Sequence, residues 1–396
     1  FVRWHYGFYP TTLLEHAIAA TLLAFVVESW RGGVRRFTWR TPFTIPVLLL
    51  IVAGALSVFA APSRLAAVGL YRAYFLEPIA FAFVLVHVIT SARRALVVLG
   101  GLGVAGIAVA APNAVLVLEG LRAHTYDVTQ TPPVVIYTTA NALALFLGPS
   151  IAVAAAILLH ASDRYARAGS AVFLVVAGPA MLLTFSRGGY LAMAAVAVGV
   201  ALSHRRRWWL LAGAAVAGGL LAAIPPVFHR IELEFQNVNG STFFGRAGRI
   251  ELWKATLQML REHPIFGAGL SGFADRIAPF WNANHPERFI DPHNIVLNFW
   301  VETGVLGVIA MAWILIVAFH TAWHGSRSSD VNWRAIEIGI LLAMVAVVVH
   351  GLVDVPYFKN DLSLQFWTLL GLAWVGAGSL SASPSTAFPS RDIKPP

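Results

Sequence analysis

The chain has 396 residues, a formal net charge of +9 and no cysteine. Charged residues make up 12 %, against about 25 % in a typical soluble domain, and hydrophobic residues make up 58 %. This composition excludes a water-soluble enzyme, and the lack of cysteine excludes disulfides and thiolate metal sites.

Apolar stretches recur along the whole chain. A membrane-spanning helix needs about 17–25 predominantly apolar residues. We count roughly eleven stretches on this scale, at 11–30, 43–61, 68–90, 94–112, 134–159, 169–185, 188–203, 208–224, 295–319, 335–353 and 361–379. The sequence therefore predicts an all-α polytopic membrane protein. Because the chain starts at Phe1 rather than Met, we allow for a preceding segment that would bring the number of spans to about twelve.

The basic residues sort to one side of this predicted bundle. If residues 204–207 lie in the cytoplasm, the connections on that side hold 15 of the 28 basic residues. They are Arg31, Arg35, Arg36, Arg40, Arg93, Arg94, Arg164, Arg167, Arg205, Arg206, Arg207, Arg327, Arg334, Arg391 and Lys394. Lysine and arginine concentrate in cytoplasmic connections of membrane proteins. The positive charge is thus a topology signal, and we expect no nucleic-acid partner.

The same topology places one long polar segment on the outer side of the membrane. It divides the chain into N-terminal transmembrane helices at 1–225, an extracytoplasmic loop with an amphipathic helix at 226–294, and C-terminal transmembrane helices at 295–380. The remaining tail at 381–396 is rich in Ser and Pro, which predicts disorder.

Within the outer loop, residues 246–263 predict one amphipathic helix that ends at Pro264. Its apolar residues recur at helical spacing: Ile250, Trp253, Leu257 and Leu260. We expect this stripe to lie on the bilayer with Trp253 buried and with Arg246 and Arg249 near the lipid headgroups. The N-terminus of the helix would favour an anion at the same place. The two arginines either hold a substrate phosphate or only snorkel to lipid phosphates.

Two further arginines are candidates on the outer side. Arg187 separates two apolar runs and is followed by two glycines. It is either an interfacial anchor or, because glycines allow close approach of a ligand, an anion-binding residue. Arg72 is the other candidate, although Glu77 would neutralise it in a structural pair.

His293 lies where the outer loop meets the next membrane helix. Histidine is the side chain that most readily takes up a proton near neutral pH, so His293 is a candidate general base. Three polar residues follow at four-residue spacing and form one stripe on that helix: Asn294, Asn298 and Glu302. We expect Glu302 to be architectural, facing a partner or a wet cavity, and Gly304 and Gly307 to let another helix pack closely.

Two weaker patterns predict no site. The segment Gly267–Gly272 matches the dinucleotide pattern G-x-G-x-x-G, but it follows a helix and a proline instead of a strand, which indicates a tight turn. His285, Asp291 and His293 match no common zinc spacing, so we predict no metal site.

Several of these segments, taken in order, resemble one family. They are Arg249–Trp253, His263–Gly269, His293–Asn294 and Glu302–Gly307, with His350–Asp354 also similar. Together they resemble the O-antigen ligase and O-antigen polymerase superfamily over a region from Arg187 to about Gly371. The N-terminal third is similar only in hydropathy and in the segment from Arg72 to Pro78.

The resemblance implies a bacterial inner-membrane glycosyltransferase of inverting mechanism with its site on the periplasmic face. Such enzymes move a glycan from undecaprenyl diphosphate to an acceptor hydroxyl, on lipid A core in ligases and on another glycan in polymerases. The resemblance implies neither a metal nor a cofactor. It puts the catalytic histidine at His293 and the two essential arginines at Arg187 and Arg249. Arg246 leaves open which arginine of the outer helix holds the phosphate.

The remaining candidates for substrate binding are Arg246, Arg72, Asn294 and Glu302. Two other classes of protein stay open beside a ligase or a polymerase. A transporter of lipid-linked glycans would show internal repeats and polar residues in broken helices at mid-membrane. The sequence instead gathers its polar residues at one face. A non-catalytic assembly protein would not need a histidine at the junction of loop and helix.

Overall fold

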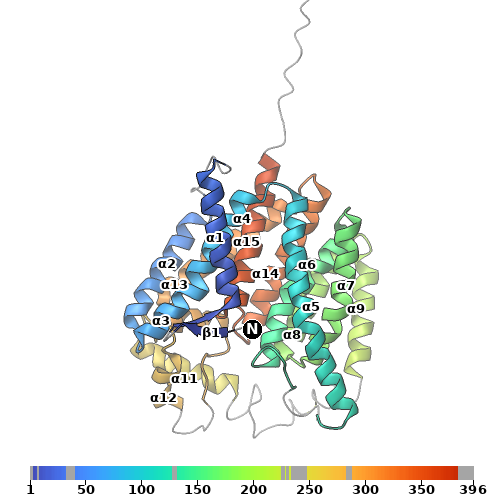
Figure 1. Ribbon diagram of the computed structural model, residues 1–396. Coiled ribbons are helices and arrows are strands. Elements are labelled where there is room, and N and C mark those ends of the chain that lie inside the picture. The colour runs from blue at the N-terminus through green and yellow to red at the C-terminus, as the bar shows by residue number, and fades with distance from the viewer. Residues whose placement is uncertain are drawn as a thin grey trace, which may run out of the picture.

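The computed structural model describes residues 3–6, 9–32, 41–126, 132–223, 228, 232, 248–281 and 288–381. Within this part of the chain the fold is almost entirely helical, and most helices run along one common direction (Figure 1). The exception is a two-stranded antiparallel sheet, in which β1 (Arg3–Tyr6) pairs with β2 (Tyr9–Thr12). The predicted all-α class is therefore confirmed except for this hairpin.

The helices follow the order of the predicted apolar stretches. The N-terminal group consists of α1 (Leu13–Trp30), α2 (Thr44–Ala60), α3 (Arg64–Tyr71), the π-helix η1 (Arg72–Leu76), α4 (Glu77–Val88), α5 (Ala92–Arg122), α6 (Ala140–His160), α7 (Arg164–Leu183), α8 (Arg187–Leu202) and α9 (Arg207–Ala222). The later helices are α11 (Arg249–Glu262), α12 (Phe273–Trp281), α13 (Ile295–Gly325), α14 (Val331–Gly351) and α15 (Asn360–Ser381). Side-chain oxygens of Thr12, Ser91, Thr139, Asp163 and Asp330 cap the helices that follow them.

Seven helical segments of the described chain are long and apolar enough to cross a membrane. They are Leu13–Trp30, Arg64–Val88, Ala92–Arg122, Ala140–His160, Arg164–Leu183, Ile295–Gly325 and Val331–Gly351. The helices Thr44–Ala60 and Arg187–Leu202 are apolar but shorter. The protein is thus a polytopic helical membrane protein, while the number of eleven spans stays a prediction.

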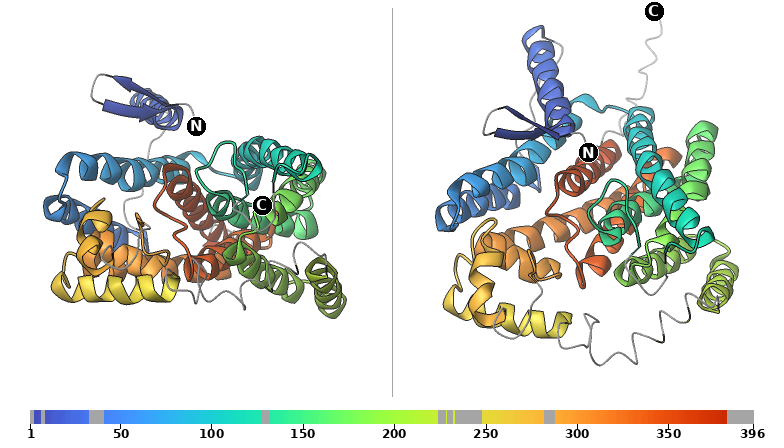
Figure 2. Two further views of the ribbon diagram at one scale, coloured as in Figure 1. Left: turned by 90° about the horizontal axis from the view of Figure 1, so that it is seen from below. Right: turned by 60° about the horizontal axis from the view of Figure 1, so that its bottom comes forward.

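Helices α6 and α14 form the centre of the bundle, with 78 % and 67 % of their spans buried. Small residues allow this close packing, because a Cβ on Gly339 of α14 would lie 2.9 Å from the Val153 backbone of α6. Helix α1 is only 11 % buried and contacts α4 and β2. Figure 2 shows α1 and its hairpin standing at the edge of the bundle.

Helices α11 and α12 gather at one end of the bundle (Figure 1). Helix α11 packs on the protein with a face that differs from the predicted apolar stripe, and its orientation on the bilayer stays a prediction. Its buried residues are Leu252, Ala255, Thr256, Met259 and Leu260, whereas Leu257 is 43 % exposed. The buried face packs on Phe273 and Trp281 of α12 and on Val301 of α13. Because Leu252, Ala255 and Met259 also recur at helical spacing, the sequence held two apolar faces, and packing within the protein selected the second.

Helix α13 is broken at Gly304, whose backbone has a φ of 69° and a ψ of −176°. The loop between α11 and α12 fills the break. The amides of Ala268 and Gly269 donate to the carbonyl of Val301 at 2.7 and 3.1 Å, and the amide of Val305 donates to the carbonyl of Ile265 at 3.0 Å. The loop thereby pairs main-chain groups that the break would leave without partners.

Two expectations about glycines need correction at this break. Gly304 admits the main chain of the loop and not another helix, because a Cβ there would lie 2.2 Å from the carbonyl oxygen of Ile265. The segment Gly267–Gly272 follows helix α11, as predicted, but it does more than turn the chain. It inserts into a membrane helix, and the positive φ of Gly267 and Gly269 makes that path possible.

Candidate active site

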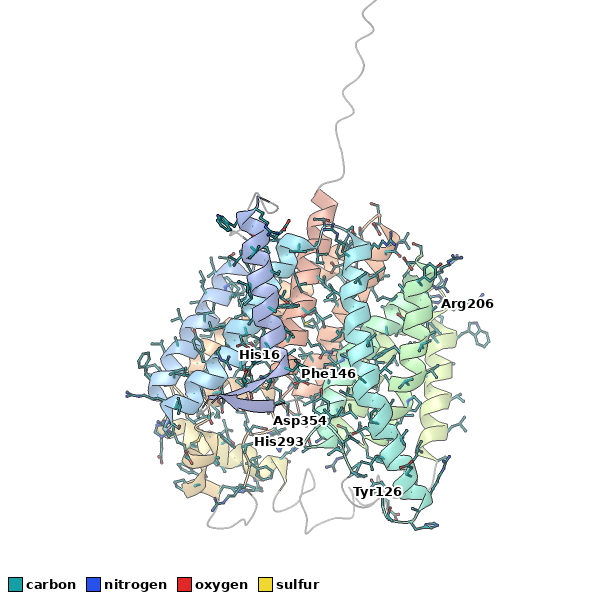
Figure 3. All side chains as sticks on the ribbon, viewed as in Figure 1. His16, Tyr126, Phe146, Arg206, His293 and Asp354 are labelled. Carbon is teal, nitrogen blue, oxygen red and sulfur yellow. The ribbon has the colours of Figure 1, made fainter. Side chains whose placement is uncertain are left out.

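His293 and Asp354 lie side by side at the end of the bundle that carries α11 and α12 (Figure 3). His293 belongs to the short segment before α13, and Asp354 belongs to the turn between α14 and α15. The two residues are 61 positions apart in the sequence. The fold therefore brings the predicted base, His293, next to Asp354. From the sequence alone, Asp354 had no role beyond its place in a segment that resembles the family.

The imidazole of His293 sits between two carboxylates. Its Nδ1 lies 3.2 Å from Oδ1 of Asp291 and 3.4 Å from Oδ1 of Asp354. The backbone amide of His293 also donates to Oδ1 of Asp291 at 2.9 Å, which supports the left-handed φ of 50° at His293. A proton on Nδ1 satisfies these carboxylates, and Nε2 then carries the lone pair that accepts a proton.

Asp354 is buried, with 7 % of its surface exposed. Burial by itself raises the pKa of a carboxyl group, but here the hydrogen bond and charge of His293 and the charges of Arg249 and His350 outweigh it and lower the pKa of Asp354 to about 2. The Oδ1 of Asp354 also accepts from the amide of Val355 at 2.9 Å. Asp354 is therefore a fixed negative charge behind the imidazole.

Arg249 is the first residue of α11, and its Nη2 lies 3.9 Å from Oδ2 of Asp354. This distance is too long for a hydrogen bond, so the carboxylate does not use up the donors of the guanidinium. The indole of Trp253 donates to the carbonyl of Pro292 at 2.9 Å, which ties the start of α11 to the segment that carries His293. Trp253 thus faces the protein, in contrast to the predicted insertion into lipid.

Arg187 begins α8, and its side chain is exposed. Its neighbour Gly188 packs against the end of α14, where an added Cβ would lie 2.7 Å from Cδ2 of His350 and 2.8 Å from Val353. The start of α8 therefore touches the segment that leads to Asp354. The three residues that the family resemblance singles out, Arg187, Arg249 and His293, all flank this segment.

The other candidate residues have partners inside the protein. Arg72 pairs with Glu77 at 2.9 Å, as expected, and also with Glu15 at 2.8 Å. The Asn294 side chain accepts from the amides of Val296 and Leu297, and it donates to the carbonyl of Leu352 at 2.9 Å. These contacts anchor the start of α13 to the turn before Asp354. Arg246 and His285 lie outside the described residues.

Glu302 is 5 % exposed, and its Oε2 accepts from the amide of Ser271 at 2.7 Å. The buried carboxyl beside a broken helix differs from the sequence-based view that polar residues gather only at one face. The break is filled by loop main chain, however, and not left open. This arrangement fits the expected architectural role of Glu302.

A metal ion would find ligands in the same cluster. Ligand atoms of Asp291, His293 and Asp354 all lie within 4.8 Å of one another. Two carboxylate oxygens and an imidazole nitrogen are a donor set that divalent ions accept. From the sequence we weighed His285, Asp291 and His293 as metal ligands, without Asp354, and predicted no metal site. That prediction stands untested, and chelation is the experiment that decides it.

The fold defines a polytopic helical membrane protein with a titratable polar site at one end of its helices. Residues 171–312 match the family model described as O-Antigen ligase, and this region includes Arg187, Arg249 and His293. A stretch of 95 residues is 28 % identical to an O-antigen ligase of Pseudomonas aeruginosa and covers 22 % of this chain. That match spans one fifth, 20 %, of the relative's length. Residues 171–312 are thus similar to the O-antigen ligase superfamily, and this similarity supports a membrane glycosyltransferase-like ligase or polymerase.

Proposed function

We propose that this protein is an O-antigen ligase-type glycosyltransferase. It would move a glycan from undecaprenyl diphosphate to a hydroxyl of lipid A core with inversion at the anomeric carbon. The observation that carries the proposal is the position of His293. Its Nδ1 faces the carboxylates of Asp291 and Asp354 at 3.2 and 3.4 Å, and Nη2 of Arg249 lies 3.9 Å from the other oxygen of Asp354. The family match over 171–312 supports the same reaction class.

In the proposed reaction His293 is the general base. Its Nε2 takes the proton of the acceptor hydroxyl as the oxygen attacks the anomeric carbon of the donor sugar. The bond between this carbon and the diphosphate oxygen breaks, and the electron pair leaves with the diphosphate. Asp291 and Asp354 stabilise the imidazolium that forms. A positioned base of this kind typically contributes about 10²–10⁴-fold to the rate.

Arg249 and Arg187 would hold the diphosphate in this reaction. A guanidinium offers planar paired donors that match phosphate oxygens, and it stabilises the negative charge that grows as the leaving group departs. Both residues stand at the N-terminal ends of helices, where unpaired amides and the helix dipole also favour an anion. Because diphosphate is a good leaving group, the mechanism needs no general acid and no metal.

The remaining candidates take lesser parts in the proposal. Arg246, which lies outside the described residues, stays the alternative to Arg249 as the arginine of the outer loop that holds the phosphate. Asn294 and Glu302 act mainly through the contacts that they make within the protein, and Arg72 is held by Glu15 and Glu77. Asp354 orients the imidazole of His293, a role that the sequence alone did not indicate.

We place the reaction on the periplasmic face of a bacterial inner membrane. His293 and Asp354 lie at one end of the helices, while Arg206, from the basic cluster expected in the cytoplasm, lies well above them in Figure 3. The proposed division of the chain is unchanged: helices at 1–225 and 295–380, the outer loop at 226–294 and the tail at 381–396.

A transfer assay with purified protein in detergent tests this function. The donor is undecaprenyl-diphosphate glycan, and the acceptors are lipid A core and free glycan in separate reactions. Transfer to lipid A core is expected, and transfer to glycan alone would identify a polymerase. The break in α13 favours a transporter as the rival class, because discontinuous membrane helices are common in transporters. Detergent removes compartments, so product formation there excludes pure transport.

A further inference from the structure

The break in α13 is closed by a set of contacts that involve three separate elements. The hydroxyl of Ser57 in α2 donates to the carbonyl of Glu302. The Oγ of Ser57 also accepts a hydrogen bond from the amide of Leu270 at 2.9 Å. The carboxylate of Glu302 accepts from the amide of Ser271 at 2.7 Å. We call the loop 263–272, together with Glu302 and Ser57, the loop lock.

The loop packs so closely on its neighbours that two of its glycines leave no space for a side chain. A Cβ on Gly267 would lie 2.2 Å from the carbonyl oxygen of Trp300, and one on Gly269 would lie 2.7 Å from Ala61 of the segment after α2. Arg276 of α12 donates to the carbonyls of Gly267 at 3.1 Å and Ala60 at 2.8 Å. The loop is therefore held from α2, α12 and α13 at once.

The loop lock connects the two helices that carry the proposed reacting groups. Arg249 is the first residue of α11, and His293 stands directly before Asn294, the cap of α13. Near these starts, the bond from Trp253 to Pro292 joins the two elements. The loop lock joins them again at Val301–Val305, about 9–15 Å along α13 from Ile295 at 1.5 Å per residue. Two attachments fix the angle between two helices, which a single attachment cannot do.

We propose that Glu302 is a positioning residue for the transfer reaction, acting through Ser271 and the loop to hold Arg249 at a fixed place relative to His293. The inference rests on the proposed function. Glu302 does not touch the donor or the acceptor, and it works as a hydrogen-bond acceptor instead of a charge. A glutamine keeps an acceptor oxygen at that place, whereas an alanine does not.

Steady-state transfer by E302A and E302Q tests the role. A misplacement of about 1 Å can cost roughly 10²-fold in rate, so we expect E302A to lose about that factor in kcat with little change in the donor KM, and E302Q to stay within about threefold of wild type. The matched control is E337Q, which changes a fully buried glutamate of α14 whose oxygens have no hydrogen-bond partner among the described residues. It should leave kcat unchanged. Equal losses in E302Q and E302A would mean that the carboxylate acts directly, and full activity in E302A would also overturn the proposal.

Hydrogen exchange of the loop amides separates this inference from the proposed function. We expect the amides of Ala268, Gly269 and Ser271 to exchange faster in E302A and to stay protected in E302Q. If E302A does not fold, S57A gives the second test, since it removes the acceptor for Leu270 and leaves the carboxylate in place. Faster exchange without any transfer by wild-type protein would defeat the proposed function and leave the loop lock standing. Unchanged exchange of these amides in both E302A and S57A would defeat the loop lock.

Discussion

The two ends of helix α14 carry buried acidic residues in opposite circumstances. Asp354, just past the C-terminal end, lies against the imidazole of His293 and the guanidinium of Arg249. Glu337, near the N-terminal end, is fully buried against Gly325 and Gly376, and neither of its oxygens has a hydrogen-bond partner among the described residues. A buried carboxylate is tolerated when charges and donors surround it and is costly when they do not. Burial alone therefore does not mark a reactive site, whereas a set of convergent partners does.

Removal of the His293 imidazole is expected to have the largest effect on transfer. We expect H293A to lose about 10²–10⁴-fold in transfer while still binding the lipid-linked donor, because only the general base is lost. The measurement is initial rate in the detergent assay, with donor binding measured separately. H324A, which changes a histidine at the other end of α13, is the control and should transfer normally. Activity above about 10 % of wild type in H293A would sink the general-base role.

Arg249 tests whether the cluster needs a shaped cation or only positive charge. We expect R249K to fail nearly as badly as R249A, by about 10²–10³-fold, because an ammonium lacks the planar paired donors. R246A should be milder. R261A removes the same charge from the last turn of α11 and should stay near wild type. A larger loss in R246A than in R249A would shift the phosphate contact to Arg246.

The contrast between Asp354 and Glu337 is testable directly in paired amide variants. D354N keeps the shape of the side chain but loses the charge that orients His293, so we expect a loss of roughly 10²-fold in kcat, the lower end of what a positioned general base contributes. E337Q should have little effect on rate. The readout is kcat for both proteins with donor and acceptor saturating. Equal rates in the two variants would show that Asp354 is only another buried acid.

The ionised Asp354 carboxylate also predicts how the stability of the protein depends on acid. The folded pKa of Asp354, about 2, lies below its ordinary value of 3.8, so the ionised form stabilises the folded protein above about pH 4. That stability is lost as the pH falls from about 4 through 2, and it amounts to about 2 kcal/mol for a difference of this size. The midpoint temperature of thermal unfolding in detergent should therefore fall more steeply with decreasing pH in wild type than in D354N. If the unfolding temperatures of the two proteins fell in parallel with pH, the ionised Asp354 beside His293 would not be a source of stability.

Chelation is expected to have the smallest effect. Transfer should survive EDTA and gain nothing from added Mg²⁺ or Mn²⁺, because Arg187 and Arg249 supply fixed positive charge where other enzymes use a metal. The Asp291, His293 and Asp354 cluster makes this a real test, since its ligand atoms lie within 4.8 Å of one another. Activity lost in EDTA and restored by metal would replace the arginine-only mechanism.

The sequence by itself determined the class of protein and the place of its chemistry. Apolar length and the distribution of arginine predict membrane helices, because both depend on local transfer of side chains between water and lipid. The position of His293 at a loop–helix junction, the helical character of 249–262 and the ordered family segments were also local features. The pairing of Arg72 with Glu77 was suggested by their closeness in the chain and their opposite charges. The π-helix η1, in which the amide of Glu77 bonds to the carbonyl of Arg72, brings these residues onto one side of the helix.

Only the tertiary structure decided which of these residues meet. His293 joins Asp354 across 61 positions, and Ser57 joins Glu302 across 245, and no periodicity in the chain records such distances. The buried face of α11 likewise depended on a choice between two apolar stripes that only packing on α12 and α13 could make. The break at Gly304 depended on a loop from elsewhere that supplied donors and an acceptor to the exposed main chain. These outcomes share one physical reason: the polar or apolar surface that a residue contacts in the folded protein lies far from it in the sequence, so the fold rather than the local sequence determines which residues meet.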